Sequence, residues 1–279
     1  MNRIRRYSFF ACFMLAILIQ PRVSAHAQSR ATALSDIPQQ INPPFQPGEK
    51  LHYKIRYGFI NAADGTLSVE KSDRTFRGQE ALHLKAEGKT ISAVALFMKV
   101  RNKYESFVST KTLMPFLFTE SVKEGSYTRD SYVRFDRDNK IVNTNKGTFD
   151  IHKNALDVLS TFYYARSLDV SDLDPGESIQ LYYFIDDKEY SMVIKYLGKE
   201  TIKTDFGRME CLKFTPSLIE GRIFRRDSDM FLWITNDANR IPVKAKVEIL
   251  VGSLTLDLKA YENLKYPMGT SMATAAKNP

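Results

Sequence analysis

Residues 51–57 read Leu-His-Tyr-Lys-Ile-Arg-Tyr, in which apolar and polar side chains alternate. This period of two predicts a β-strand with one buried face. The same alternation recurs at residues 82–87 and 190–196, and less regular versions cover 179–183, 230–235, 243–251 and 254–261. Turn signals separate these runs, such as Asp64-Gly65, Pro175-Gly176 and Phe206-Gly207. We therefore expect an all-β protein: a curved antiparallel sheet, a half-open β-barrel or a sandwich.

The composition is that of a globular protein. Of the 279 residues, 43% are apolar and 26% are charged, while 13 Gly and 11 Pro are too few for a collagen-like or generally disordered chain. Predicted strands do not alternate with predicted helices along the sequence, which argues against a parallel α/β sheet.

One segment departs from the strand pattern. Its apolar side chains recur at helical spacing in two stripes: Leu156, Leu159 and Tyr163, and Ala155, Val158 and Phe162. We expect one buried α-helix over residues 155–168, lying across the concave side of the sheet, with Asn154 as its N-cap. A shorter helical turn is expected at residues 92–98.

The first 27 residues have the features of a secretory signal peptide. Arg3, Arg5 and Arg6 precede an apolar run over residues 9–19. Ala25-His26-Ala27 then supplies small residues at the two positions that a signal peptidase recognises before the cleavage site. The run of about eleven residues is shorter than the roughly 20 that span a bilayer, which argues against an N-terminal membrane anchor. We expect cleavage after Ala27 and a periplasmic protein that is not transmembrane.

The rest of the chain divides into three parts. Residues 28–44 are predicted to be a linker, residues 45–266 a single β domain, and residues 267–279 a disordered tail.

The leader carries four Arg and no acidic residue, so its removal lowers the formal net charge from +8 to +4. Because Lys and Arg are interspersed with Asp and Glu, we expect no nucleic-acid partner.

Cleavage of the leader leaves Cys211 as the single cysteine, so no intramolecular disulfide can form. In the strand-like run 209–214, Leu212 and Phe214 form the cleaner apolar face, and Cys211 shares the other face with Lys213. We expect Cys211 to be a small buried packing residue rather than a nucleophile.

No set of residues is identified as catalytic, metal-binding or cofactor-binding. The histidines His52, His83 and His152 are widely spaced, and no paired-Cys or H-E-x-x-H motif accompanies them. A triad can be drawn from Asp150, His152 and Ser160. However, Ser160 falls inside the predicted helix and lacks the G-x-S-x-G elbow that exposes a nucleophile.

Two groups of residues are candidates for ligand contact. The first, which would line an apolar cavity, consists of Leu159, Phe162, Tyr163 and Trp233; the alternative is that these side chains fill the core. The second is the cluster Arg222, Arg225 and Arg226, which would bind an anion such as a lipid head group or an acidic sugar. The alternative for this cluster is a solvated turn.

Four stretches, in this order, carry a family resemblance. They are 45–60 (Phe-Gln-Pro-Gly-Glu-Lys-Leu-His-Tyr-Lys-Ile-Arg-Tyr-Gly-Phe-Ile), 131–136 (Ser-Tyr-Val-Arg-Phe-Asp), 157–166 (Asp-Val-Leu-Ser-Thr-Phe-Tyr-Tyr-Ala-Arg), and 233–237 with 240–243 (Trp-Ile-Thr-Asn-Asp, Arg-Ile-Pro-Val). Together they resemble the DUF3108 family of exported bacterial proteins. The resemblance implies an all-β domain similar to the half-open barrels of lipoprotein carriers or to YmcC-like envelope proteins. It implies no activity and no catalytic residue.

These observations favour a non-enzymatic module of the cell envelope that holds an apolar or amphipathic ligand, such as a lipid, or an envelope partner. One alternative is an envelope-assembly scaffold without a ligand site, and another is an unrecognised hydrolase. A deep apolar cavity would favour the first function, a filled core the second, and clustered carboxylates or a Ser–His contact the third.

Overall fold

One continuous β-sheet organises the chain. The computed structural model describes residues 31–33, 40–217, 230–249 and 252–277, so the predicted leader and Arg222, Arg225 and Arg226 lie outside the described residues. The strands in this part of the chain are β1 (Ala31–Ala33), β2 (Lys50–Tyr57), β3 (Ile60–Phe76), β4 (Gln79–Thr90), β5 (Val100–Ser109), β6 (Pro115–Glu124), β7 (Tyr127–Asp136), β8 (Ile141–Thr144), β9 (Gly147–Asp150), β10 (Ser178–Ile185), β11 (Lys188–Thr204), β12 (Gly207–Pro216), β13 (Met230–Thr235), β14 (Pro242–Glu248) and β15 (Ser253–Glu262). The helices described are α2 (Ser92–Phe97), α3 (Val158–Arg166) and α4 (Met272–Lys277).

The sheet is an antiparallel meander whose strands β2 and β15 lie side by side near its middle. Strands β2 to β9 pair each with the next, strands β10 to β15 do the same, and β15 pairs with β2. These pairs are antiparallel, whereas β1 adds to β10 in parallel. Within the described residues β9 and β1 are the two edges, and the sheet is not closed into a barrel. The predicted all-β fold is confirmed, in the form of a single open sheet.

Register shifts bend the strands around the interior. One lies between Tyr196 and Gly198 in β11, and another between Leu258 and Ala260 in β15. An extra residue in one strand of a pair increases the local bend and twist. Gly198 has a φ of 100°, a conformation that favours glycine, which suits it to this position.

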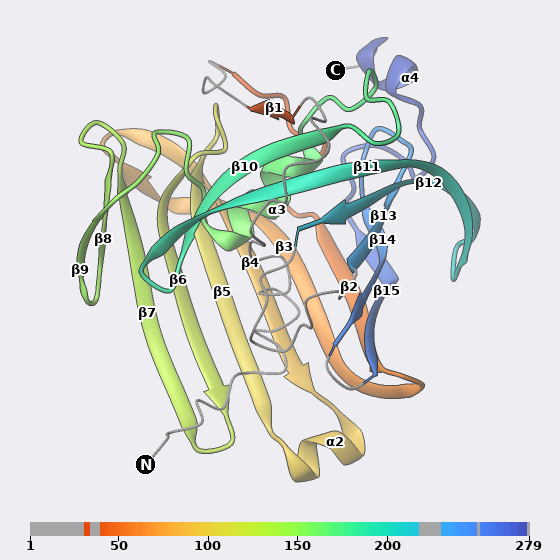
Figure 1. Ribbon diagram of the computed structural model, residues 1–279, viewed down its shortest axis with the longest axis horizontal. Helices are drawn as coiled ribbons and strands as arrows, with labels where there is room; N and C mark the ends of the chain where they lie inside the picture. Colours follow the sequence, from red (N-terminus) through yellow and green to blue (C-terminus); the bar gives the residue numbers. More distant parts are fainter. Residues whose placement is uncertain (1–30, 34–39, 218–229, 250–251, 278–279) are drawn as a thin grey trace.

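Helix α3 connects the two halves of the meander and lies inside the curve. It contacts β10, β5 and β4, and Figure 1 shows it where β10 and β11 cross the long strands. The buried helix predicted over 155–168 is confirmed in the shorter form Val158–Arg166, and α2 is the short helix predicted at 92–98. No helix in the described residues combines the length and the hydropathy needed to cross a membrane.

Polar side chains bridge the two halves of the sheet near the open seam. In the β10–β11 turn, Asp186 accepts a hydrogen bond of 3.1 Å from Arg129 of β7. Asp187 accepts one of 3.0 Å from the hydroxyl of Thr144 and forms an ion pair with Lys146. These contacts join β7 and the β8–β9 hairpin to β10 and β11, where no backbone ladder connects them.

Segments on either side of the predicted β domain also contact it. In residues 28–44, β1 pairs with β10, and the backbone N–H of Ile41 bonds the carbonyl of Lys111 at 2.7 Å. In residues 267–279, the N–H of Gly269 bonds Oδ2 of Asp237 at 2.9 Å, and α4 follows.

Cys211 is fully buried in β12, as the sequence predicted. It pairs with Thr235 of β13 on the face opposite Leu212. Burial, with a smaller contribution from nearby carboxylates, raises the pKa of the Cys211 thiol to about 12. The thiolate, which is the nucleophilic form, is therefore scarce at neutral pH.

We expect Cys211 to react slowly with a thiol reagent in the native protein and rapidly after unfolding, because only unfolding exposes it. Cys211→Ala should lower the free energy of unfolding by about 1 kcal/mol, as small core truncations do. Time-resolved labelling with and without denaturant measures the first effect, and urea unfolding the second. Rapid labelling of the native protein would contradict the buried position.

Candidate functional site

The N-terminus of α3 is fixed by a capping box. Oδ1 of Asp157 accepts hydrogen bonds from the backbone N–H groups of Leu159 and Ser160, both at 2.8 Å, and the Asp157 N–H donates to the Ser160 hydroxyl. Oδ2 accepts a bond of 2.6 Å from Ser106 on β5. The prediction of Asn154 as N-cap is wrong, because Asp157 caps the helix while it is anchored to the sheet. Burial raises the pKa of Asp157, and its hydrogen bonds oppose this shift.

The loop before α3 is fastened to the sheet by an arginine. Arg137 donates hydrogen bonds to the backbone carbonyls of Pro115, Lys153 and Ala155. Burial lowers the pKa of Arg137 to about 10. The N–H of Leu156 then donates to the backbone carbonyl of Tyr182 in β10 at 2.9 Å, so the loop also pairs with this strand.

The C-terminus of α3 carries a buried ion pair. Arg166 donates to both carboxylate oxygens of Glu49, at 2.7 and 3.0 Å, and the two residues are 3% and 0% exposed. The guanidinium lies 5.1 Å from the ring centroid of Phe45 and 5.5 Å from that of Tyr163. Burial disfavours the charge of Arg166, but Glu49 more than offsets this and raises its pKa.

The same guanidinium also holds the β13–β14 turn. It donates to the backbone carbonyls of Asn239, at 3.0 Å, and Arg240, at 3.2 Å. Oδ1 of Asp237 organises this turn by accepting from the N–H groups of Asn239 and Arg240 and from the hydroxyl of Thr235. Arg166 therefore connects the start of β2, the end of α3 and the β13–β14 turn.

Sequence reasoning missed Glu49 and Arg166, although a signal was present. Arg166 follows Leu159 by seven residues, so it continues the apolar stripe that predicts the buried face of the helix. A charged residue in such a stripe requires a buried partner. The sequence contains no indication that the partner is Glu49, which lies 117 residues earlier.

Two apolar cavities flank Phe162 on the concave side of the sheet. One, of about 60 Å³, lies between α3 and strands β2, β3, β4 and β13 to β15. The other, of about 40 Å³, lies between α3 and strands β11 to β14. Phe162, Leu232 and Pro242 border both cavities and form the wall between them. We call the two cavities and this wall the Phe162 groove.

Small residues on the inner face of the sheet create the larger cavity. Gly65 of β3 and Ala86 of β4 line it and offer little or no side chain. The adjoining wall comes from Tyr53, Leu67 and Leu256, so the lining is almost entirely apolar. Such a surface can hold hydrocarbon but offers few hydrogen bonds to orient a polar molecule.

The predicted ligand residues have different positions. Leu159 and Tyr163 are fully buried in the core, whereas Phe162 is half-buried and faces the groove. Trp233 lies on the other face of β13, where Lys213 is 5.2 Å from its ring centroid. The structure thus brings the three helix residues to the interior and separates Trp233 from them.

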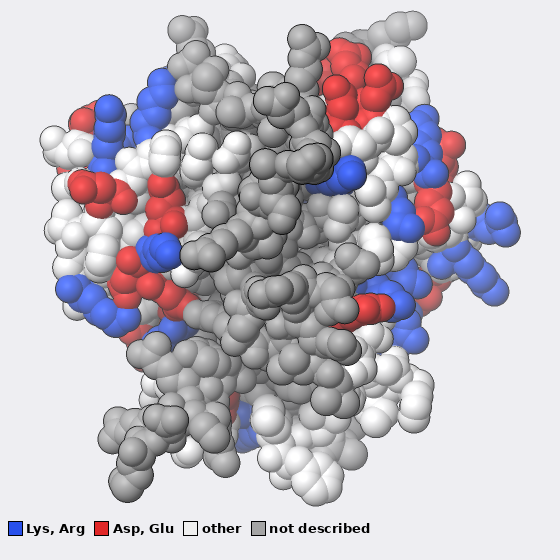
Figure 2. Space-filling view, viewed as in Figure 1, with Lys and Arg blue, Asp and Glu red and all other residues white. Residues whose placement is uncertain are grey.

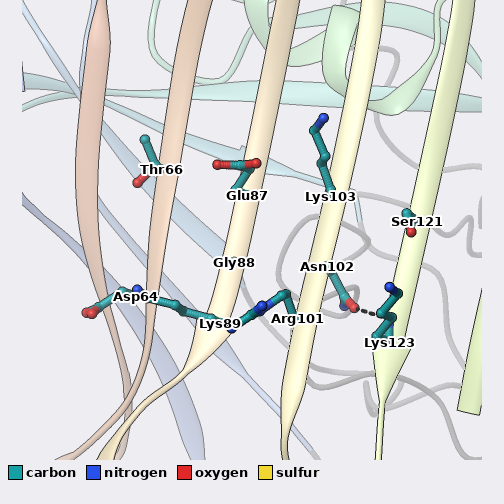
Figure 3. Close-up of a pocket in the computed structure, with 10 residues that line it drawn as sticks. All are labelled: Asp64, Thr66, Glu87, Gly88, Lys89, Arg101, Asn102, Lys103, Ser121 and Lys123. Atoms are coloured by element: carbon teal, nitrogen blue, oxygen red, sulfur yellow. Dashed lines mark hydrogen bonds between the residues drawn. The ribbon is translucent and has the colours of Figure 1, made fainter.

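A larger hollow, of about 440 Å³, lies on the outer face of the sheet and is polar. Figure 3 labels the side chains of β3 to β6 that line it. Asp64 in this hollow pairs with Lys54, and Lys103 pairs with Glu105 at 2.9 Å. Charges that face water are screened and contribute little to binding a small ligand. The Phe162 groove is therefore the stronger candidate ligand site.

The described residues contain no group of three or more His, Cys, Asp or Glu side chains arranged to hold a metal ion. Each of the three histidines in the described residues contacts a carboxylate: His52 with Glu262, His83 with Glu105 and His152 with Glu189. The hydroxyl of Ser160 is engaged with the backbone of Asp157. His152 and Ser160 therefore bond to different residues and not to each other, as a catalytic triad would require.

Comparison with known proteins agrees with the fold. The model of the DUF3108 family, described as a protein of unknown function, matches residues 52–259. The chain belongs to the DUF3108 family. Comparison of this DUF3108 sequence with curated proteins found no match.

Two solved structures illustrate what the DUF3108 chain is similar to. A β-barrel-like protein of the DUF1849 family from Brucella abortus is 11% identical, with a TM-score of 0.53, and the match covers 80% of this chain and 100% of that one. A Bacteroides fragilis protein, provisionally described as exported with a YmcC-like fold, is 11% identical, with a TM-score of 0.35 and coverage of 80% and 99%. At these identities the likeness concerns the fold alone.

Three of the four stretches that carry the DUF3108 resemblance meet at Arg166. Stretch 45–60 supplies Glu49, stretch 157–166 ends with Arg166 itself, and the stretch 233–237 with 240–243 contributes the carbonyl of Arg240. The resemblance in these stretches therefore coincides with a structural requirement, the burial of one ion pair.

We expect Glu49→Gln and Arg166→Met each to lower the free energy of unfolding by about 3–5 kcal/mol, because each leaves one buried charge without its partner. The double variant should lose much less than the sum, since it buries no charge. Urea unfolding of the four proteins measures the coupling. Additive losses would show that the two side chains do not depend on each other.

We expect Phe162→Ala to lower the free energy of unfolding by only about 1–2 kcal/mol, because the ring borders existing cavities. Leu159→Ala on the same helix is the matched control. It should cost about 3 kcal/mol or more, because it removes a fully packed side chain. The same denaturant measurement compares them, and an equal or larger loss for Phe162→Ala would identify Phe162 as ordinary core.

Proposed function

We propose that this protein is an exported, non-enzymatic module of the cell envelope that holds an apolar chain in the Phe162 groove. The observation that carries this proposal is the pair of apolar cavities on either side of one half-buried aromatic ring. The ligand class is hydrocarbon, such as the acyl portion of an amphipathic lipid, because the lining offers few polar partners.

The size of the cavities determines how a ligand would enter. At about 60 and 40 Å³, each is smaller than the roughly 150 Å³ of an apolar cavity known to accept benzene. A chain of several carbons must therefore displace the Phe162 ring, which joins the two cavities into one. Phe162 is suited to this movement because it is not fully packed.

The surroundings of the ring support such a role. The capping box at Asp157 and the ion pair at Arg166 hold both ends of α3, so one side chain can move while the helix stays in place. The short apolar run followed by Ala25-His26-Ala27 supports export. A scaffold function without a ligand is the second candidate, and it requires that the groove remain empty.

We expect the mature chain, purified from the periplasm, to bind the uncharged fluorophore N-phenylnaphthylamine with an affinity in the micromolar range. Ala86→Leu should weaken this binding about tenfold or more, because its added carbons fill the larger cavity. Ala81→Leu is the matched control: it adds the same carbons at a buried alanine of the same strand that borders neither cavity.

Fluorescence titration and denaturant unfolding should be measured on the same preparations. The proposal requires that Ala81→Leu bind like the natural protein even if both variants lose stability through overpacking. It fails if the natural protein takes up no fluorophore, or if the two alanine variants bind equally well. In either case the scaffold function would be favoured.

A further inference from the structure

Among the described residues, the three most exposed large apolar side chains gather at one end of the molecule. Phe59, Leu96 and Phe97 are 93%, 85% and 91% exposed, and Ile60 and Met98 are each about half exposed. They belong to the β2–β3 turn with the first residue of β3, and to α2 with the residue that follows it. We call these five residues the apolar rim.

The two parts of the apolar rim are neighbours in space. The N–H of Ile91, just before α2, bonds the carbonyl of Ala62 near the start of β3 at 3.1 Å. Figure 1 shows α2 and the β2–β3 turn together at the lower end, away from α4. In Figure 2 the lower right of the molecule is mostly white, with few Lys, Arg, Asp or Glu atoms, whereas both charge signs are interspersed along the sides. Contiguous exposed apolar surface of this kind marks an interaction site.

A row of cations lies beside the apolar rim on the outer face of the sheet. Lys89 of β4 is directly opposite Arg101 of β5, which is directly opposite Lys123 of β6. Figure 3 shows the three side chains in line, with Asp64 at the end of the row. Among the described residues none of the three cations forms an ion pair, and Asp64 is paired with Lys54. We call Lys89, Arg101 and Lys123 the cation row.

The three side chains of the cation row lie close enough to repel one another. Like charges directly opposite on neighbouring strands repel one another. Lys89 is the penultimate residue of β4, which leads into α2, and Arg101 is the second residue of β5, which leaves it. The repulsion is therefore located next to the apolar rim, where a bound anionic surface would relieve it.

We propose that the apolar rim and the cation row together bind the surface of an anionic lipid bilayer. Phe59, Leu96 and Phe97 enter the boundary between head groups and acyl chains, and the cation row faces the phosphates. A second copy of the chain is a poorer partner for this surface, because it would bring a second cation row close to the first. The proposal is independent of the Phe162 groove, which lies inside the sheet.

The test is flotation of the mature chain with vesicles of phosphatidylglycerol or of phosphatidylcholine. We expect binding to phosphatidylglycerol that weakens as salt is added, because counter-ions screen the cation row. A variant carrying Phe59→Ser, Leu96→Ser and Phe97→Ser should bind at least about tenfold more weakly. Lys89→Gln with Arg101→Gln should weaken binding to phosphatidylglycerol only.

A matched control replaces exposed apolar side chains elsewhere on the surface. Phe206 and Val193 are 37% and 36% exposed and lie outside the apolar rim, so Phe206→Ser with Val193→Ser should leave vesicle binding unchanged. The rim side chains face water, so their replacement should not impair folding, which circular dichroism of each variant would check.

Several outcomes would overturn the proposal. They are the absence of vesicle binding by the natural chain, equal binding by the rim variant, and equal loss in the control variant. Analytical ultracentrifugation could also detect a dimer. If the rim substitutions dissociate that dimer, the surface would be assigned to a second copy of the chain instead. Ala86→Leu should bind vesicles normally, so failure of the groove and failure of this surface are distinguishable.

Discussion

The buried ion pair between Glu49 and Arg166 is the interaction on which the rest of the structure depends. Removing two charges from water is costly, and only close geometry with further hydrogen bonds offsets that cost. Here the guanidinium makes two bonds to the carboxylate and two to backbone carbonyls. Because α3 connects the two halves of the meander, fixing its end also fixes how the halves of the sheet face each other.

The two sides of α3 have different packing, and this difference creates the groove. Leu159 and Tyr163 fill the space toward the core, and the ring of Tyr163 meets Phe45 at 5.0 Å beside the ion pair. On the other side, Gly65 and Ala86 leave room that Phe162 only partly fills. A helix held at both ends cannot shift to close this room, so the cavities persist as a property of the fold.

The two ends of the molecule also differ in chemistry. The end near Asp237 is held by hydrogen bonds that reach Gly269 and the residues before α4. The opposite end exposes the apolar rim and has the cation row on its outer face. Buried polar networks thus stabilise one end, while the other retains apolar and cationic surface that folding does not use.

The sequence by itself determined the period-two strands, the buried helix and the buried position of Cys211, because each follows from side-chain patterns over a few neighbouring residues. It also marked the stretches around Glu49, Arg166 and Arg240, but as family resemblance without a physical role. Only the tertiary structure decided that these stretches meet, that Trp233 faces away from α3, and that Phe162 borders two cavities. The reason is physical: pairing of Glu49 with Arg166, and the space left beside Gly65 and Ala86, depend on how distant strands curve around the helix, and no local pattern encodes that curvature.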